Sequence, residues 1–287
     1  MDGKAMRFLK EGLARINADT RSSKSPSARL SELVTKQQWR GQMLCYLNLY
    51  VAFCAAAVAD WPLVKESMRS MTAAAEKFEV PLIGCLGKLA LYLEGVYYQG
   101  SGDLKAALDV FANDAFRFAD IPYSTSEQRV ERDIALLAAL NSLLILQDPQ
   151  WQDPLEPYCS DHPNKDIQTA FSLIRATTKT SSAAMIHETK NHLAMALNRA
   201  KATANTQFLC LVLSIMCSKF FNNCVGDQAE KSALAARRHA ELSKNKLWMS
   251  VSGGLLAQFY DISDKRAEAQ ATLSEACILA HEALPNL

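Results

Sequence analysis

Three cysteines spaced by seven residues are the first side chains in this sequence that could do chemistry. Cys210, Cys217 and Cys224 would lie along one face of a helix. Cysteine thiolates bind zinc, but a helical rise of about 1.5 Å per residue separates successive sulfurs by about 10 Å. A single metal ion cannot bridge that distance. The spacing therefore predicts three cysteines packed in a helical core and no metal site.

A histidine pattern further upstream also resembles a metal-binding helix. His187 and Glu188 are followed by His192, whereas zinc-binding helices place their two histidines four residues apart, which is about one turn. An offset of five residues turns the two imidazole rings toward different faces. We therefore expect no zinc at this position.

Cys159 and His162 could form half of a metal site or a nucleophilic pair. No second half-site lies near them in the sequence, and nucleophilic catalysis needs a third group that orients the base. The simpler interpretation is that Asp161 or Asn164 caps a helix that begins near Lys165.

Motifs that mark nucleotide-binding and hydrolase sites are absent: the sequence contains no GxxxxGK[ST], GxGxxG or GxSxG. Gly253 and Gly254 lie within an expected helix, where glycine costs about 1 kcal/mol relative to alanine, so we expect a close helix contact there. We expect no catalytic, cofactor-binding or metal-binding residues. An enzyme carried on a helical array is the alternative, and it predicts a polar pocket with perturbed titrating groups.

Composition predicts an all-α protein. The 287 residues are 49% hydrophobic and 21% charged, with 11 glycines, 9 prolines and no run of alternating valine and isoleucine. The formal net charge of +1 argues against direct nucleic-acid binding, because phosphate contacts require a basic excess. The apolar stretch Met43 to Ala59 is interrupted by Asn48 and predicts a buried helix, not a membrane span.

The cysteines indicate a reducing compartment. The sequence has 8 cysteines without a CxxC pair, and most of them lie in apolar helical stretches, as free cysteines do in intracellular proteins. No cationic and then apolar signal segment opens the chain, so we expect the protein in the nucleus or cytosol.

The strongest organising signal is a recurring spacing: a small residue, a tyrosine three positions later, a second small residue and then a large apolar one. It begins at Gly95, recurs at Ala257 and appears in a weaker form at Ala52. This spacing is typical of the tetratricopeptide helix–turn–helix repeat, in which the small residues let two helices touch. The predicted fold is a tetratricopeptide-like helical-hairpin solenoid with a right-handed superhelix, an architecture that usually binds other proteins.

The predicted organisation is an N-terminal helix and Ser-rich linker over 1–37, followed by the repeat array over 38–287. A first helix is expected over Asp2–Ile16, and Asp19–Ala28 reads as a linker. Within it, Ser25-Pro26 is a candidate phosphorylation site or an ordinary flexible loop. We expect a continuous core across 120–165, although this segment departs from the repeat. Array helices are predicted at 38–59, 62–78, 82–99, 104–116, 126–146, 153–160, 165–178, 183–203, 206–223, 228–243, 246–262 and 265–283.

The first helix of each hairpin should line a concave wall, apolar and aromatic in the early repeats and polar in the last. Such a surface suits a partner segment that orders on binding. The alternative is that another part of this chain fills the groove. The candidate partner-binding residues are Tyr46, Leu49, Phe53, Tyr92, Val96 and Gln99.

The densest basic cluster offers a second candidate surface. Lys231, Arg237 and Arg238 lie on one predicted helix and could dock an acidic or phosphorylated partner. The alternative is the solvated face of a packed helix.

Beyond the repeats, several stretches resemble the fungal members of the cohesin loading factor family. The more specific ones are Asp161-His162-Pro163-Asn164 and Leu247-Trp248-Met249-Ser250-Val251. The others are Asp60-Trp61, the run from Tyr92 to Gly100 with Gly102-Asp103-Leu104, Ala204-Asn205-Thr206-Gln207 and Gly226-Asp227-Gln228-Ala229. Together they spread over about residues 40–285, and the chain resembles the C-terminal half of the longer family members.

This resemblance implies a non-enzymatic scaffold in the nucleus. In that family, the tetratricopeptide subunit embraces the disordered N-terminal segment of a large HEAT-repeat loader, and the pair places cohesin on chromatin for sister chromatid cohesion in mitosis. The implied partners are that loader directly and the cohesin complex and chromatin indirectly, with no cofactor, membrane or nucleic-acid contact. A generic tetratricopeptide adaptor of another multiprotein complex is the alternative, which explains the repeats but not the more specific stretches.

Overall fold

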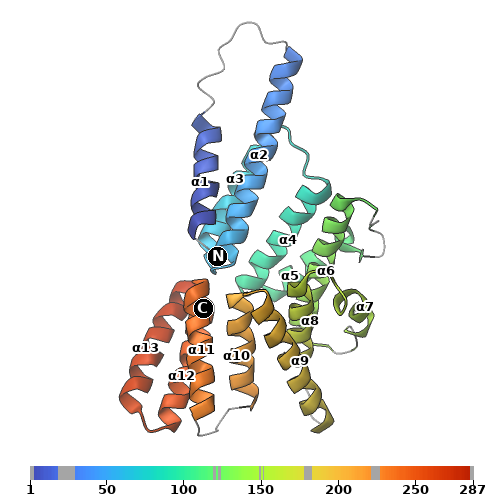
Figure 1. Cartoon of the computed structure of the whole chain (residues 1–287). Helices are drawn as coiled ribbons and strands as arrows, with labels where there is room; N and C mark the ends of the chain where they lie inside the picture. The colour runs from blue at the N-terminus through green and yellow to red at the C-terminus, as the bar shows by residue number, and fades with distance from the viewer. Residues whose placement is uncertain are drawn as a thin grey trace. The chain divides into compact units, whose positions relative to one another are not determined.

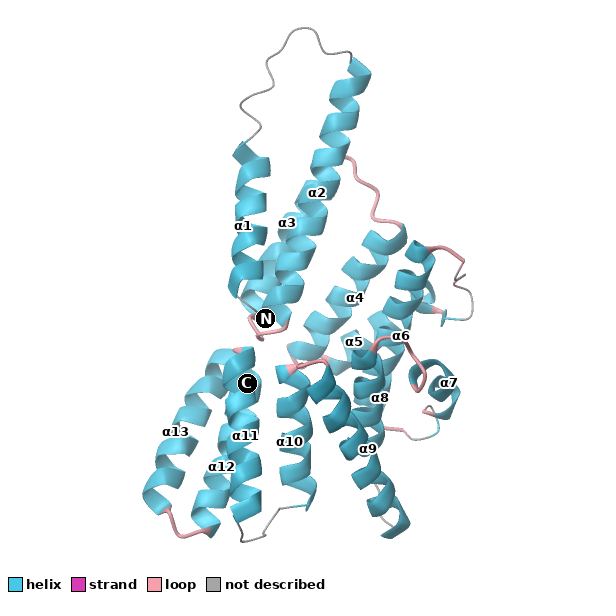
Figure 2. Ribbon diagram, viewed as in Figure 1, coloured by secondary structure: helices cyan, strands magenta, loops and turns pink. Residues whose placement is uncertain are grey.

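A computed structural model describes residues 3–18, 30–118, 121, 124–148, 150, 152–177, 183–220 and 227–284. Every regular element in these ranges is a helix (Figures 1 and 2), which confirms the all-α prediction. The chain divides into two compact units, Met1–Ala138 and Ala139–Leu287, and the boundary falls inside helix α6 (Ser126–Leu146).

The first unit contains two helical hairpins, α2 with α3 and α4 with α5. Helix α1 packs against α2, and α4 contacts both helices of the first hairpin, as in a helical-hairpin repeat. The elements of this unit are α1 (Gly3–Ala18), α2 (Leu30–Ala56), α3 (Trp61–Lys77), α4 (Gly84–Gly100), α5 (Leu104–Phe111), a 3-10 turn (Asp114–Phe116) and most of α6.

Side-chain caps precede two helices that begin within one residue of their predicted starts at 62 and 104. The carboxylate of Asp60 accepts a hydrogen bond from the backbone N–H of Leu63 at 3.2 Å, with Pro62 in the first turn of α3. Asp103 accepts from the backbone N–H of Ala106 at 3.0 Å at the start of α5. These carboxylates satisfy otherwise unpaired N–H groups, and so fix where the hairpins turn.

Small residues set the helix crossings of the first unit. Ala52 and Ala55 of α2 are fully buried against the core that α2, α3 and α4 share. A Cβ atom added to Gly95 of α4 would lie 2.4 Å from Cε1 of Phe111 on α5. The glycine that begins the strongest repeat signature is therefore required by the aromatic ring packed on it.

The second unit contains three successive hairpins: α8 with α9, α10 with α11, and α12 with α13. Helix α10 packs on α9, and α12 packs on α11. The first helices of the hairpins, α8, α10 and α12, also contact one another in sequence. The elements are a 3-10 turn (Asp153–Leu155), α7 (Glu156–Cys159), α8 (Lys165–Thr177), α9 (Ala183–Ala202), α10 (Thr206–Phe220), α11 (Asp227–Ser243), α12 (Lys246–Ile262) and α13 (Arg266–Ala283).

The predicted helix at 38–59 differs most from the structure, because α2 begins at Leu30 and so crosses the predicted boundary after residue 37. Residues 36–39 of α2 are exposed and form no buried stripe. The lysine and glutamines here nevertheless have good helix propensity. The predicted helix at 104–116 is also too long, since Asn113 caps a separate 3-10 turn.

The expectations for the linker, the continuous array and the apolar stretch after Met43 have different outcomes. The linker Asp19–Ala28 with Ser25-Pro26 lies outside the described residues. The continuous array over 38–287 stays a prediction, and the boundary between the two units falls in the segment where the repeat signature fades. Among the helices that the structure describes, including the one formed by the apolar stretch after Met43, none has the length and apolarity that crossing a membrane requires.

Two glycine substitutions test the helix crossing. Gly95→Leu should lower the free energy of unfolding by at least about 1–3 kcal/mol, because the new side chain overlaps the ring of Phe111. Gly254→Ala in α12 should raise it by about 0.5–1 kcal/mol, since no atom lies within 4 Å of the added Cβ. Urea unfolding of the two variants measures both changes, and equal effects would contradict the predicted crossing.

Candidate functional site

A row of aromatic and apolar side chains lies along one face of α2. Trp39, Met43, Tyr46 and Tyr50 are spaced by four, three and four residues, which places them on the same side of a helix. Trp39 is 56% exposed and Tyr50 is 48% exposed. The rings of Tyr46 and Tyr50 stack with their centroids 6.4 Å apart. We call these four residues the aromatic stripe.

Beyond Tyr50, the aromatic contacts pass from the first hairpin to the second. The ring of Phe53 on α2 lies 6.3 Å from that of Tyr92 on α4, and Tyr92 lies 5.9 Å from Phe111 on α5. Both Phe53 and Tyr92 are half-buried. These two rings therefore hold the hairpins together and position the stripe.

The structure separates the predicted groove residues into different environments. Tyr46 lies on the aromatic stripe, whereas Leu49 is only 1% exposed and belongs to the core. Leu49 offers a partner no surface, because the face of α2 that carries it packs inward. Val96 and Gln99 are half-buried on α4.

Sequence reasoning missed the two most exposed aromatic residues of this surface, Trp39 and Tyr50. The predicted groove residues Leu49 and Phe53 lie three residues before and one residue after the small residue Ala52, and Phe53 turns toward Tyr92 of α4. The four–three–four spacing of the stripe was visible in the sequence. All four residues of the stripe lie within the helix predicted at 38–59, so this spacing alone would have pointed to Trp39 and Tyr50.

The stripe is uncharged. Burial raises the pKa of Tyr46, and the nearby Cys85, Tyr50 and Glu127 raise it further, so the phenol stays protonated at neutral pH. The stripe thus offers aromatic rings together with neutral hydroxyl groups that can donate hydrogen bonds.

A partly buried ion pair joins the helices that flank Tyr46. Lys88 of α4 donates a hydrogen bond to Glu131 of α6 at 2.6 Å, and both side chains are less than one-fifth exposed. This ion pair joins α4 to the part of α6 that belongs to the first unit.

The predicted basic patch contains one arginine that is already engaged. Arg237 of α11 pairs with Glu241 of the same helix at 3.1 Å and with Glu275 of α13 at 2.6 Å. Burial lowers its pKa, but the hydrogen bonds that the guanidinium donates to the two glutamates outweigh burial, and the pKa is raised overall. Arg237 therefore links α11 to α13, while Lys231 and Arg238 are exposed on α11.

A cavity of about 530 Å³ lies between α11, α12 and α13 and includes both arginines. Glu241 and Glu275 also line it, together with Tyr260 of α12. The cavity is thus of mixed charge, and because its two carboxylates already pair with Arg237, this arginine is not free for the acidic partner that the sequence suggests as one alternative.

The cysteine candidates are buried thiols. Burial raises the pKa of Cys159 to about 12 and those of Cys210 and Cys217 to about 11. A thiol with such a pKa carries almost no thiolate at neutral pH, and the thiolate is the nucleophile and the metal ligand. Cys224 lies outside the described residues. Nowhere in the ranges that the structure describes do three metal-ligating side chains cluster.

The histidine patterns have local structural roles. His192 lies 3.4 Å from Glu188, and burial lowers its pKa, whereas His187 is exposed. A ring nitrogen of His162 accepts a hydrogen bond from the backbone N–H of Asn164 at 3.1 Å.

Asn164 in turn accepts a hydrogen bond from the backbone N–H of Asp166, as predicted for the cap of α8.

The predicted close helix contact is confirmed at Gly253 of α12, where an added Cβ atom would lie 3.2 Å from the Cβ atom of Ala276 on α13. It is wrong at Gly254, where no atom lies within 4 Å.

Thiol reactivity tests the burial of the cysteines. At pH 8, an alkylating reagent should modify the exposed Cys277 quickly, and Cys159, Cys210 and Cys217 only after unfolding, because burial keeps their thiols protonated and inaccessible. Peptide mapping by mass spectrometry measures each site. Modification of Cys159 in the folded chain as fast as that of Cys277 would contradict this description.

Two tyrosine substitutions distinguish a ring packed between the hairpins from a ring exposed on the surface. Tyr92→Ala should lower the free energy of unfolding by about 2–3 kcal/mol, because it removes the ring between Phe53 and Phe111. Tyr50→Ala should lower it by less than about 1 kcal/mol, since the side chain is half exposed. Chemical unfolding measures both values, and the reverse order would contradict the assignment of the two rings.

One of the comparisons with known proteins gave a match. Searches against curated proteins and against solved structures found none. The family model described as cohesin loading factor matches residues 1–267, a range that includes the aromatic stripe, the whole first unit and the second unit as far as the start of α13. Given a match over most of its length, the chain belongs to the cohesin loading factor family.

Proposed function

We propose that this chain is a non-catalytic interaction subunit of a cohesin loader that binds the N-terminal segment of a large HEAT-repeat partner along the aromatic stripe. The family gives the chain a role in cohesin loading. The single observation that supports the finer proposal is the stripe itself, an exposed row of aromatic side chains on the first helix of a hairpin.

The chemistry of the stripe suits an extended or helical partner segment. Trp39 and Tyr50 present large rings with few rotatable bonds, and such residues often dominate the energy of protein interfaces. A disordered segment can fold against rings arranged along about three turns of a helix and bury apolar side chains on them. The half-buried Tyr46 between the two adds a neutral hydroxyl group.

The partner carries the contacts with cohesin and chromatin in this proposal. With a formal net charge of +1, this chain has little electrostatic affinity for nucleic acid, and its effect on chromatin is indirect. It acts in the nucleus, in sister chromatid cohesion during cell division. A generic adaptor of another complex would use the same hairpins and stripe, but it would not account for the family match.

A crosslinked pulldown from nuclear extract tests the proposal. The intact chain should recover a large HEAT-repeat protein and cohesin subunits, identified by mass spectrometry. The double variant Trp39→Ala, Tyr50→Ala should recover at least about tenfold less of the HEAT-repeat protein, because it removes the two exposed rings of the stripe.

The matched control is Tyr158→Ala, which removes a tyrosine of similar exposure, 43%, from the second unit. It should leave recovery unchanged. Recovery of an unrelated complex by the intact chain would favour the generic adaptor, and equal losses in both variants would contradict the role of the stripe.

A further inference from the structure

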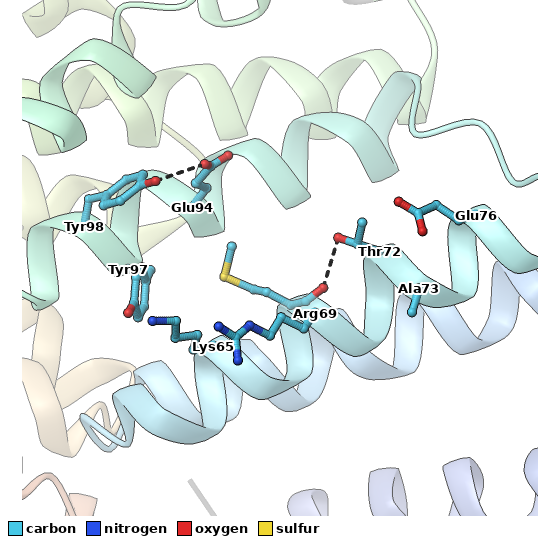
Figure 3. Close-up of a pocket in the computed structure, with 9 residues that line it drawn as sticks. Lys65, Arg69, Thr72, Ala73, Glu76, Glu94, Tyr97 and Tyr98 are labelled. Carbon is cyan, nitrogen blue, oxygen red and sulfur yellow. Dashed lines mark hydrogen bonds between the residues drawn. The ribbon is translucent and has the colours of Figure 1, made fainter.

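A pocket of about 390 Å³ lies between α3 and α4, and these two helices supply all of its lining residues (Figure 3). It is on a different side of α4 from the rings that support the aromatic stripe. Glu94 lines the pocket, and Tyr92, two residues earlier, points about 200° away around the helix toward Phe53. A ligand in the pocket would therefore leave the stripe accessible.

The floor of the pocket is apolar. Met68 of α3 and Tyr97 of α4 are half-buried and pack on the core of the first unit. A thioether and an aromatic ring adapt to side chains of different shapes, and methionine is common at surfaces that bind several partners. The floor can accept one apolar side chain.

One end of the pocket is positively charged. Lys65 and Arg69 are four residues apart on α3, both are exposed, and Figure 3 shows them on the same side of the pocket as Tyr97. Neither forms an ion pair with any residue that the structure describes. Arg237 differs in this respect, because two glutamates neutralise it. The charges of Lys65 and Arg69 are thus left for an external anion.

The acidic residues of the pocket are Glu94 and Glu76, so its charge differs from one end to the other. Glu94 accepts a hydrogen bond from the hydroxyl of Tyr98 at 3.5 Å, on the α4 side (Figure 3). Glu76 lies seven residues after Arg69, which is about 10 Å along the axis of α3. A bound segment must therefore direct its acidic side chain toward Lys65 and Arg69 and keep it away from Glu76.

We propose that this pocket binds a short segment of a partner protein that carries an apolar side chain next to acidic ones. The apolar side chain lies on Met68 and Tyr97, and a carboxylate pairs with Lys65 and Arg69. The volume is within the range of sites that hold a few side chains. This second site does not depend on the aromatic stripe or on the partner proposed for it.

Peptide binding to the full chain tests the proposal. The probes are fluorescein-labelled octapeptides with a central leucine flanked by glutamates, by lysines or by serines, and fluorescence anisotropy reports binding. The glutamate peptide should bind, and the lysine and serine peptides should bind at least about tenfold more weakly, because only glutamate complements Lys65 and Arg69. Replacing the leucine of the glutamate peptide by serine should also abolish binding.

Charge reversal locates the site. Arg69→Glu and Lys65→Glu should each weaken binding of the glutamate peptide by about 5–10-fold. Lys105→Glu makes the same charge change at an exposed position on α5 outside the pocket lining and should have little effect. The stripe variant Trp39→Ala, Tyr50→Ala should bind the peptide normally, so the two proposals can fail independently.

Three results would overturn the proposal: no binding of the glutamate peptide at millimolar concentration, equal binding of the three peptides, or equal losses from Arg69→Glu and Lys105→Glu. Circular dichroism of each variant confirms that the fold is retained before binding is compared.

Discussion

Two helices of a hairpin can approach closely only where at least one of them carries a small side chain, and both units depend on this constraint. In the first unit, Gly95 lets the ring of Phe111 lie directly against α4. In the second, Gly253 brings α12 against Ala276 of α13. Because Phe111 also packs on Tyr92, and Tyr92 on Phe53, the close crossing of α4 and α5 extends to the helix that carries the aromatic stripe. Packing therefore holds the stripe on a rigid support.

The helices of the first unit present different chemistry on different sides. On α2, the core-facing side holds Leu49, while Trp39 and Tyr50 of the aromatic stripe are exposed. On α4, the ring that supports the stripe and the residues of the charged pocket point apart because neighbouring positions rotate by about 100°. One pair of hairpins can in this way offer an uncharged aromatic surface and a separate charged pocket.

Features that depend on a few neighbouring residues were predictable from the sequence. The caps at Asp60, Asp103 and Asn164 and the close approach at Gly95 follow from local spacing. Features set by distant parts of the chain were not predictable. The burial of Leu49 depends on the direction from which α4 packs, and Arg237 is neutralised by a glutamate on another helix, 38 residues away. The family resemblance, which rests on specific stretches, is confirmed by the match over residues 1–267.

The most direct test of the central claim is site-specific photocrosslinking from the aromatic stripe in nuclear extract. A photoreactive phenylalanine analogue at position 50 should crosslink to a segment near the N-terminus of a large HEAT-repeat protein, while the same analogue at position 158 should not. Mass spectrometry of the crosslinked peptides identifies the partner and its segment. Crosslinks from position 158 alone, or from position 50 only to unrelated proteins, would contradict the claim that the stripe is where this subunit holds its loader.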